Sequence, residues 1–283
     1  MTEKSNTKNG CAMLLGGFDG LHVGHRQLLT RAKASGLPVG VMTIAGGKST
    51  DSLFTFRERE DIFRRAGADF LFELPFDEIK DLSGEEFSGL LVEKFSPKLF
   101  VCGEDFRFGA GAKGTPELIK QATRVCVEVF PLVQFNGEKI SSTSVKKMLD
   151  SGKVESASAL LGEDYFLIGE VVKDRQVGRT LGFPTANVLY PSDKYPLKKG
   201  VYETCVEVDG KRYKGITNYG ARPTFAESTV VTESYLDGFE GDLYGKEIKV
   251  SFVRFLREVR KFDTPQALRT QLKEDIGRVR RND

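Results

Sequence analysis

Residues 12–33 read AMLLGGFDGLHVGHRQLLTRAK and set the pattern for the first half of the chain. The apolar residues 12–15 are followed by a glycine-rich turn at residues 16–20 and by a helical pattern of apolar residues from His25 to Lys33. This order predicts a strand, a turn and a helix. It is the unit from which parallel sheets with helices on their faces are built.

The two histidines of this 283-residue chain, His22 and His25, both lie at the start of the predicted helix. Residues three apart share one helix face, so both imidazoles are expected to point to the same place. Free backbone N–H groups and the helix dipole attract phosphate there, and imidazoles can donate hydrogen bonds to phosphoryl oxygens. A nucleotide triphosphate site is therefore favoured over two ordinary surface histidines. A metal site is disfavoured, because no Cys or Glu stands nearby at ligand spacing, although a distant ligand stays open.

Strand-like and helix-like segments alternate onward to Gly152. The predicted strands are 12–15, 39–44, 70–74, 99–102 and 125–129. Thr55 and Ser83 are each followed three residues later by glutamate, which indicates capping boxes, and Thr115-Pro116 indicates another helix start. The alternation predicts a Rossmann-like α/β domain with a parallel sheet, whose ligands bind beyond the carboxyl ends of the strands.

The second half of the chain has a different pattern. Its β-rich runs are Tyr165–Val172, Ala186–Leu189, Val201–Val208, Lys211–Thr217, Val230–Leu236 and Lys249–Phe255. Asp209-Gly210 indicates a two-residue hairpin, and Thr264-Pro265 begins a closing helix. We predict a small antiparallel β-barrel with a terminal helix. Because residues 150–159 are small and polar, the predicted domains are 1–158 and 159–283.

Composition excludes several classes of protein. The net charge is +2, from 42 basic and 40 acidic residues, so neither nucleic acid nor an anionic membrane is expected as a partner. No signal-peptide core and no apolar run of membrane-spanning length occurs. The four cysteines form no CxxC pair, and Cys11, Cys102 and Cys126 are expected to be buried thiols. We predict a reduced, cytoplasmic protein.

Residues 178–187 read GRTLGFPTAN, the most specific string in the chain. Gly178 and Gly182, with Arg179 between them, suit a loop that wraps nucleotide phosphates. The Thr185 hydroxyl and the Asn187 amide oxygen are hard ligands suited to Mg²⁺ beside ATP. A segment that merely leads into a strand would account for the proline of this string but not for the rest of it.

This string resembles the G-R-x-x-G-x-P-T-A-N motif of riboflavin kinases. Residues 16–25 resemble the G-x-F-D-G-x-H-x-G-H signature of the adenylyltransferase half of bacterial bifunctional riboflavin kinases/FAD synthetases. Segments 215–225, 233–245 and 261–264 also resemble kinase segments, and 102–109 and 140–146 resemble adenylyltransferase segments. The resemblance extends from Gly16 to about Ile276.

The resemblance implies two activities. The C-terminal domain would make FMN from riboflavin and Mg·ATP with Glu233 as general base, and the N-terminal domain would make FAD from FMN and a second ATP. His22 and His25 would act at the α-phosphate. The further nucleotide-binding residues implied for the N-terminal domain are Gly16, Phe18, Asp19, Gly24, Ser141, Ser142, Thr143 and Lys146. Those implied for the flavin are Asp105, Phe106 and Phe108.

Three positions depart from the family pattern. Lys146 replaces an arginine, Tyr235 replaces a histidine, and the Ala45-Gly46-Gly47 segment replaces an aromatic P-x-P segment. The Tyr235 change is expected to tune the flavin pocket of the kinase half without removing its base. Lys146 and the Ala45-Gly46-Gly47 segment leave open a monofunctional riboflavin kinase whose N-terminal half only binds nucleotide or flavin. A flavin-sensing module is disfavoured by Glu233, and a relative of aminoacyl-tRNA synthetases is disfavoured by the near-neutral charge.

Overall fold

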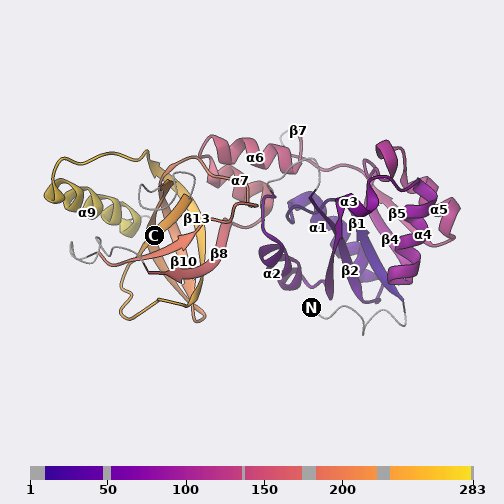
Figure 1. Cartoon of the computed structure of the whole chain (residues 1–283), viewed down its shortest axis with the longest axis horizontal. Helices are drawn as coiled ribbons and strands as arrows, with labels where there is room; N and C mark the ends of the chain where they lie inside the picture. Colours follow the sequence, from indigo (N-terminus) through magenta and orange to yellow (C-terminus); the bar gives the residue numbers. More distant parts are fainter. Residues whose placement is uncertain (1–9, 47–51, 136–137, 174–182, 222–229, 282–283) are drawn as a thin grey trace. The chain divides into compact units, whose positions relative to one another are not determined.

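The computed structural model describes residues 10–46, 52–135, 138–173, 183–221 and 230–281. The chain forms two compact units, Met1–Ser144 and Val145–Asp283, which are described separately (Figure 1). The division falls inside helix α6 (Ser142–Asp150). The boundary between functional domains after residue 158 stays a prediction.

The first unit contains the predicted five-stranded parallel sheet, in the order β3-β2-β1-β4-β5. Four of these strands, β1, β2, β4 and β5, are labelled in Figure 1. Its strands are β1 (Cys11–Leu15), β2 (Val39–Ala45), β3 (Phe70–Pro75), β4 (Pro97–Gly103) and β5 (Cys126–Phe130). The chain moves outward from β1 through β2 to β3, and then returns to the other side of β1 with β4. The strand order therefore reverses between β1 and β4, where α/β sheets bind their ligands.

Helices connect these strands. They are α1 (Val23–Ala34), α2 (Phe56–Ala66), α3 (Phe76–Ile79), α4 (Gly84–Phe95) and α5 (Pro116–Thr123). The capping boxes predicted at Thr55 and Ser83 are confirmed, because each hydroxyl accepts from the N3 backbone N–H and the N3 glutamate reaches back. Thr115 is the N-cap residue of α5, but its side chain makes no capping hydrogen bond.

The central strand β1 is buried along its whole length, as expected for a parallel sheet covered on both faces. Cys11, Met13 and Leu15 belong to the core cluster that contains Phe87 and Leu91 of α4. Because the end of β1 is packed in this core, the position of the turn that follows it is determined.

The second unit contains the predicted antiparallel barrel, closed in the order β10-β11-β12-β9-β8-β13. Its strands are β8 (Tyr165–Val172), β9 (Thr185–Leu189), β10 (Gly200–Val208), β11 (Lys211–Ala221), β12 (Val230–Leu236) and β13 (Glu247–Arg257). Asp209 and Gly210 both have positive φ, which confirms the tight hairpin between β10 and β11. The closing helix α9 (Pro265–Arg281) buries Ile276 and Val279 against Ile216 of β11.

Three local details differ from the sequence-based expectations. The segment expected to link the domains contains helix α7 (Val154–Leu161), which buries Val154, Ala157 and Leu160. A two-stranded hairpin of β6 (Gln134–Phe135) and β7 (Glu138–Lys139) precedes α6. Cys126 is exposed at the start of the outer strand β5, whereas Cys11 and Cys102 are buried as expected.

Among the described residues, no helix combines the length and the apolar character needed to cross a membrane.

Candidate functional sites

The first candidate site lies where the strand order of the parallel sheet reverses. A cavity of about 470 Å³ opens there, between the turn that follows β1 and the loop that follows β4. The predicted site residues that line it are Gly16, Phe18, Asp19, His22, Gly24, His25, Asp105, Phe106, Ser141 and Ser142. Segments separated by more than a hundred residues thus meet at the place that the topology favours for a ligand.

The two imidazoles stack at the start of α1, with ring centroids 3.5 Å apart. His22 is the N-cap residue, and its Nδ1 accepts the backbone N–H of His25 over 3.2 Å. His25 Nδ1 lies 2.9 Å from the carbonyl oxygen of Gly20, which can only accept, so this nitrogen carries a proton. The backbone therefore determines the tautomer of both rings.

Burial keeps both histidines neutral at physiological pH. Desolvation lowers the pKa of His22 to about 4 and that of His25 to about 3. Neutral His22, whose Nδ1 is an acceptor, carries its proton on Nε2 and can donate it to a phosphoryl oxygen. Neutral His25 has a lone pair on Nε2, so in this state only His22 has an N–H group at Nε2, and the roles of both histidines stay predictions.

Close contacts surround two glycines, Gly16 in the turn and Gly24 in the first turn of α1. A Cβ atom on Gly16 would lie 2.9 Å from the ring of Phe18, and one on Gly24 would lie 3.2 Å from Nδ1 of His22. Phe18 itself has a φ of +38°, and its buried ring lies 4.6 Å from that of His25. The turn is thus packed against the imidazole pair.

A series of hydrogen bonds from α2 and β2 holds the turn that follows β1. The hydroxyl of Thr43 donates to the carbonyl oxygen of Gly17 over 2.9 Å and accepts from Nη1 of Arg59 over 2.5 Å. Nη2 of Arg59 lies 2.5 Å from Glu73, and the arginine side chain is 5% exposed. Sequence patterns did not indicate Arg59 as a site residue, because its partners come from two other elements.

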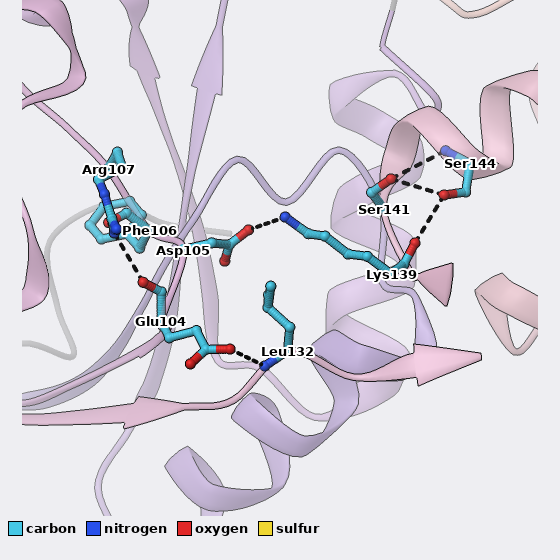
Figure 2. A network of polar contacts seen from close by, with 8 residues as sticks. All are labelled: Glu104, Asp105, Phe106, Arg107, Leu132, Lys139, Ser141 and Ser144. Atoms are coloured by element: carbon cyan, nitrogen blue, oxygen red, sulfur yellow. Dashed lines mark hydrogen bonds and ion pairs between the residues drawn. The ribbon is translucent and has the colours of Figure 1, made fainter. Parts of the chain in front are cut away.

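The opposite wall of the cavity is a polar network between the loop after β4 and the hairpin before α6. Figure 2 shows Lys139 reaching toward Asp105, with Nζ 2.6 Å from Oδ2. Ser144 donates to the Lys139 carbonyl oxygen, and the hydroxyls of Ser141 and Ser144 lie 3.0 Å apart (Figure 2). Lys139 lines the cavity but was not singled out from the sequence.

Three predicted residues lie elsewhere than on the cavity wall. Phe108 is buried in the core, stacked on Phe87 with centroids 5.0 Å apart. Thr143 follows Ser142 in the first turn of α6 but is not part of the described lining. Lys146 belongs to the second unit, where its ammonium lies over the ring of Tyr195 at 4.9 Å.

The second candidate site lies on the barrel, where β9, β12 and β11 run side by side. Glu233 of β12 is the cross-strand neighbour of Asn187 on β9 and of Asn218 on β11. The hydroxyl of Thr185 donates to Oε1 of Glu233 over 2.9 Å. Residues 48 positions apart in sequence are thereby joined by one hydrogen bond.

Two amide oxygens at this site are buried without a hydrogen-bond partner among the described residues, Oδ1 of Asn187 and Oδ1 of Asn218. Thr185 and Asn187 also line a cavity of about 490 Å³, together with residues 239–244. Unsatisfied buried oxygens are costly, and a bound water or ion is one way in which such an oxygen is satisfied. Gly178, Arg179 and Gly182 lie outside the described residues.

Tyr235, which stands in place of the family's histidine, continues this face of the barrel. Its ring packs edge-on against Phe183, and its hydroxyl lies 3.4 Å from Asp237. Asp237 accepts from both Nε and Nη2 of Arg280 in α9, and these bonds lower the pKa of the Asp237 carboxyl. The tyrosine thus connects the closing helix to the segment that precedes Thr185.

Two family models match the chain, and together they divide it much as the two compact units do. The family model for FAD synthetase matches residues 4–144, and the model for riboflavin kinase matches residues 161–282. A bifunctional riboflavin kinase/FMN adenylyltransferase of Escherichia coli K12 is 35% identical over 95% of this chain and 91% of its own length. The protein of that name from Bacillus subtilis is 32% identical over 93% of this chain and 89% of its own.

The chain is also similar, along nearly its whole length, to a solved structure. It is a Streptococcus pneumoniae protein described as a macrolide-efflux protein, which is 30% identical and covers 98% of both chains with a TM-score of 0.86.

Proposed function

Since this chain belongs to the family of bifunctional riboflavin kinases/FMN adenylyltransferases, with an FAD synthetase domain followed by a riboflavin kinase domain, we propose which of its residues perform each reaction. Its substrates in this proposal are riboflavin, FMN and ATP, and its products are FMN, FAD, ADP and pyrophosphate. We also propose a cytoplasmic location, where ATP is available and the four free cysteines stay reduced.

In the kinase domain, the terminal ribityl hydroxyl of riboflavin attacks the γ-phosphorus of ATP. The new O–P bond forms as the bond to the β-phosphate oxygen breaks, and ADP leaves with that electron pair. Glu233 accepts the proton of the attacking hydroxyl. Its hydrogen bond from Thr185 supports this role, because it orients the carboxylate beside the proposed metal ligands.

The residues around Glu233 fit a magnesium ion. The orphaned Oδ1 of Asn187 is a hard oxygen donor, and the Thr185 oxygen keeps its lone pairs because its proton is donated to Glu233. Asn187 and Thr185 would therefore hold Mg²⁺, which in this setting would neutralise charge on the ATP phosphates.

In the adenylyltransferase domain, a phosphate oxygen of FMN attacks the α-phosphorus of a second ATP. The bond from that phosphorus to the bridging β-oxygen breaks, and pyrophosphate leaves with the electron pair. The FMN phosphate is already ionised, so the step needs alignment and charge stabilisation rather than a base. His22 would donate from Nε2 to the α-phosphate, while Ser141 and Ser142 would hold the leaving phosphates at the start of α6.

The observation that carries this proposal is the presence of two separate sites, each built from the residues that its own chemistry needs. The test is chromatography of the products after the pure full-length protein is incubated with Mg·ATP and either riboflavin or FMN. We expect FMN and FAD from riboflavin, and FAD from FMN, with no product when EDTA replaces Mg²⁺. FMN alone from riboflavin would refute the proposed roles of the N-terminal residues, and no product from either substrate would refute the whole proposal.

A further inference from the structure

The ion pair between Lys139 and Asp105 joins two parts of the adenylyltransferase cavity that have different predicted ligands. Asp105 belongs to the loop after β4 that is proposed to bind flavin, and Lys139 immediately precedes the Ile140–Ser142 stretch that is proposed to bind phosphates. The two side chains meet with an N–O distance of 2.6 Å (Figure 2). In the ion pair, the Lys139 ammonium is bound to a carboxylate of the proposed flavin loop. The Asp105 carboxylate is bound to an ammonium beside the proposed phosphate site.

A triphosphate brings several negative charges into this cavity, so a cation in its wall has a large effect on binding. The basic residues of the described lining are His22, His25, Arg107 and Lys139. Both histidines are neutral, as shown above. Nη1 of Arg107 donates to the backbone carbonyls of Glu104 and Phe106, within its own loop (Figure 2).

Lys139 differs from Arg107 because its partner is the side chain of another loop. We propose that Lys139 is the cationic ligand of the ATP phosphates in the N-terminal cavity, and that it leaves Asp105 when ATP binds. This inference rests on the adenylyltransferase function proposed above.

The ion pair is suited to such an exchange. The Lys139 side chain is 49% exposed and that of Asp105 is 45% exposed, so the pair lies in a high-dielectric setting and contributes little to stability. The flexible lysine stem allows the ammonium to move while its backbone stays held by the hydrogen bond from Ser144.

The exchange couples the two substrates. Without ATP, the Asp105 carboxylate is occupied by Lys139, and a flavin N–H or ribityl hydroxyl has to compete for it. Once the ammonium moves to the phosphates, the carboxylate is free to accept from the flavin. ATP therefore raises the affinity for FMN, and by thermodynamic reciprocity FMN raises the affinity for ATP.

The first experiment measures the KM for ATP in FAD formation from FMN. We expect Lys139→Met to raise it about tenfold, because a charge-assisted contact is lost, and Lys139→Arg to restore most of the affinity. Lys120→Met removes the same charge from the exposed side of α5 and should leave the KM unchanged. FMN formation from riboflavin is the internal control and should stay the same in all variants. An unchanged KM for ATP in Lys139→Met would overturn the proposal.

The second experiment measures how the KM for FMN depends on ATP concentration. In the wild-type protein we expect it to fall about fivefold from low to saturating ATP. In Lys139→Met and Asp105→Asn this dependence should vanish, although only the first variant should bind ATP more weakly. If the ion pair were only structural, the two variants would change the KM for ATP and the ATP dependence of the KM for FMN in the same way. Persistence of the wild-type dependence in Lys139→Met would refute the coupling.

A binding measurement separates this inference from the proposed function. Calorimetric titration with Mg·pyrophosphate needs no turnover, and a contribution from the kinase domain is the same in wild type and variant. If the wild-type protein forms no FAD, the proposed N-terminal function fails, yet weaker pyrophosphate binding by Lys139→Met still supports Lys139 as the phosphate ligand. Equal binding by both proteins overturns it.

Discussion

At the scale of single residues, burial decides what the paired histidines can do. Imidazoles exposed at a helix start would be half-charged near pH 6.5, but His22 and His25 are desolvated and stay neutral well below that pH. A neutral pair does not attract phosphate by charge. It provides hydrogen-bonding groups whose tautomers are determined by the backbone. A positive charge that binds phosphate therefore has to come from another side chain.

This burial predicts a pH dependence of stability. The folded-state pKa of each histidine lies below the unfolded value of about 6.5, so its contribution is complete above that pH and is lost as the pH falls. Between pH 7.5 and pH 5 we expect the wild-type free energy of unfolding to fall by roughly 4 kcal/mol more than that of a His22→Gln/His25→Asn variant, about 2 kcal/mol for each histidine. Urea unfolding at both pH values measures the difference. The remaining titrating groups are the same in the two proteins, so parallel pH profiles would contradict the predicted burial.

At the scale of elements, Arg59 shows how one helix residue supports a functional turn. It lies in α2 but reaches β2 and β3, and the Thr43 hydroxyl transmits its position to the carbonyl of Gly17. The turn is thereby held by three secondary-structure elements besides its own strand.

We predict that Arg59→Met destabilises the protein by about 3 kcal/mol, because it leaves Glu73 and the buried Thr43 hydroxyl without their partner. FAD formation should fall as well, since the Gly17 turn loses its support, whereas FMN formation should be spared at a temperature where the variant is folded. Arg57→Met is the matched control, because Arg57 is exposed on the same helix, and its effect should stay within about 0.5 kcal/mol. Denaturant unfolding and product chromatography measure the two effects. A loss below 1 kcal/mol would show that this chain of contacts is not important for stability.

The elements themselves were largely predictable from the sequence. The strands of the parallel sheet, the capping boxes at Thr55 and Ser83 and the Asp209-Gly210 hairpin all depend on neighbours within a few residues. Helix α7 was not predicted, because its small residues resemble a linker and only burial of Val154 and Leu160 stabilises it as a helix. The β6–β7 hairpin is too short to produce a periodic pattern.

At the scale of the whole molecule, the chain carries two sites in two compact units. Each unit has its own cavity and its own set of polar residues. We therefore predict that the two activities can be removed one at a time.

The prediction is a reciprocal pair of variants. Glu233→Gln should lower FMN formation by at least about 100-fold, the usual contribution of a general base, and leave FAD formation from FMN intact. His22→Ala should abolish FAD formation and leave FMN formation intact. The measurement is the initial rate of each product with its own substrate, and circular dichroism checks that both variants are folded. Equal loss of both activities in either variant would contradict this division.

The sequence alone was enough to predict the fold class, the two-part architecture and the residues of the recognisable motifs. It could do so because hydrophobic periodicity, capping residues and turn glycines act locally, and because a parallel βαβ arrangement brings the ends of its strands to one edge. His22, Asp105 and Ser141 were therefore expected in one place, and they line one cavity.

How these residues interact depends on contacts that form only in the folded protein. The pairing of Lys139 with Asp105, the support of Gly17 by Thr43 and Arg59, and the placing of Asn218 beside Glu233 join segments that are distant in sequence. The neutrality of the histidines depends on desolvation by neighbours that no local pattern specifies. The protonation state of a side chain and its ion-pair partner thus depend on the folded structure, since the electrostatic energy of a group depends on everything packed around it.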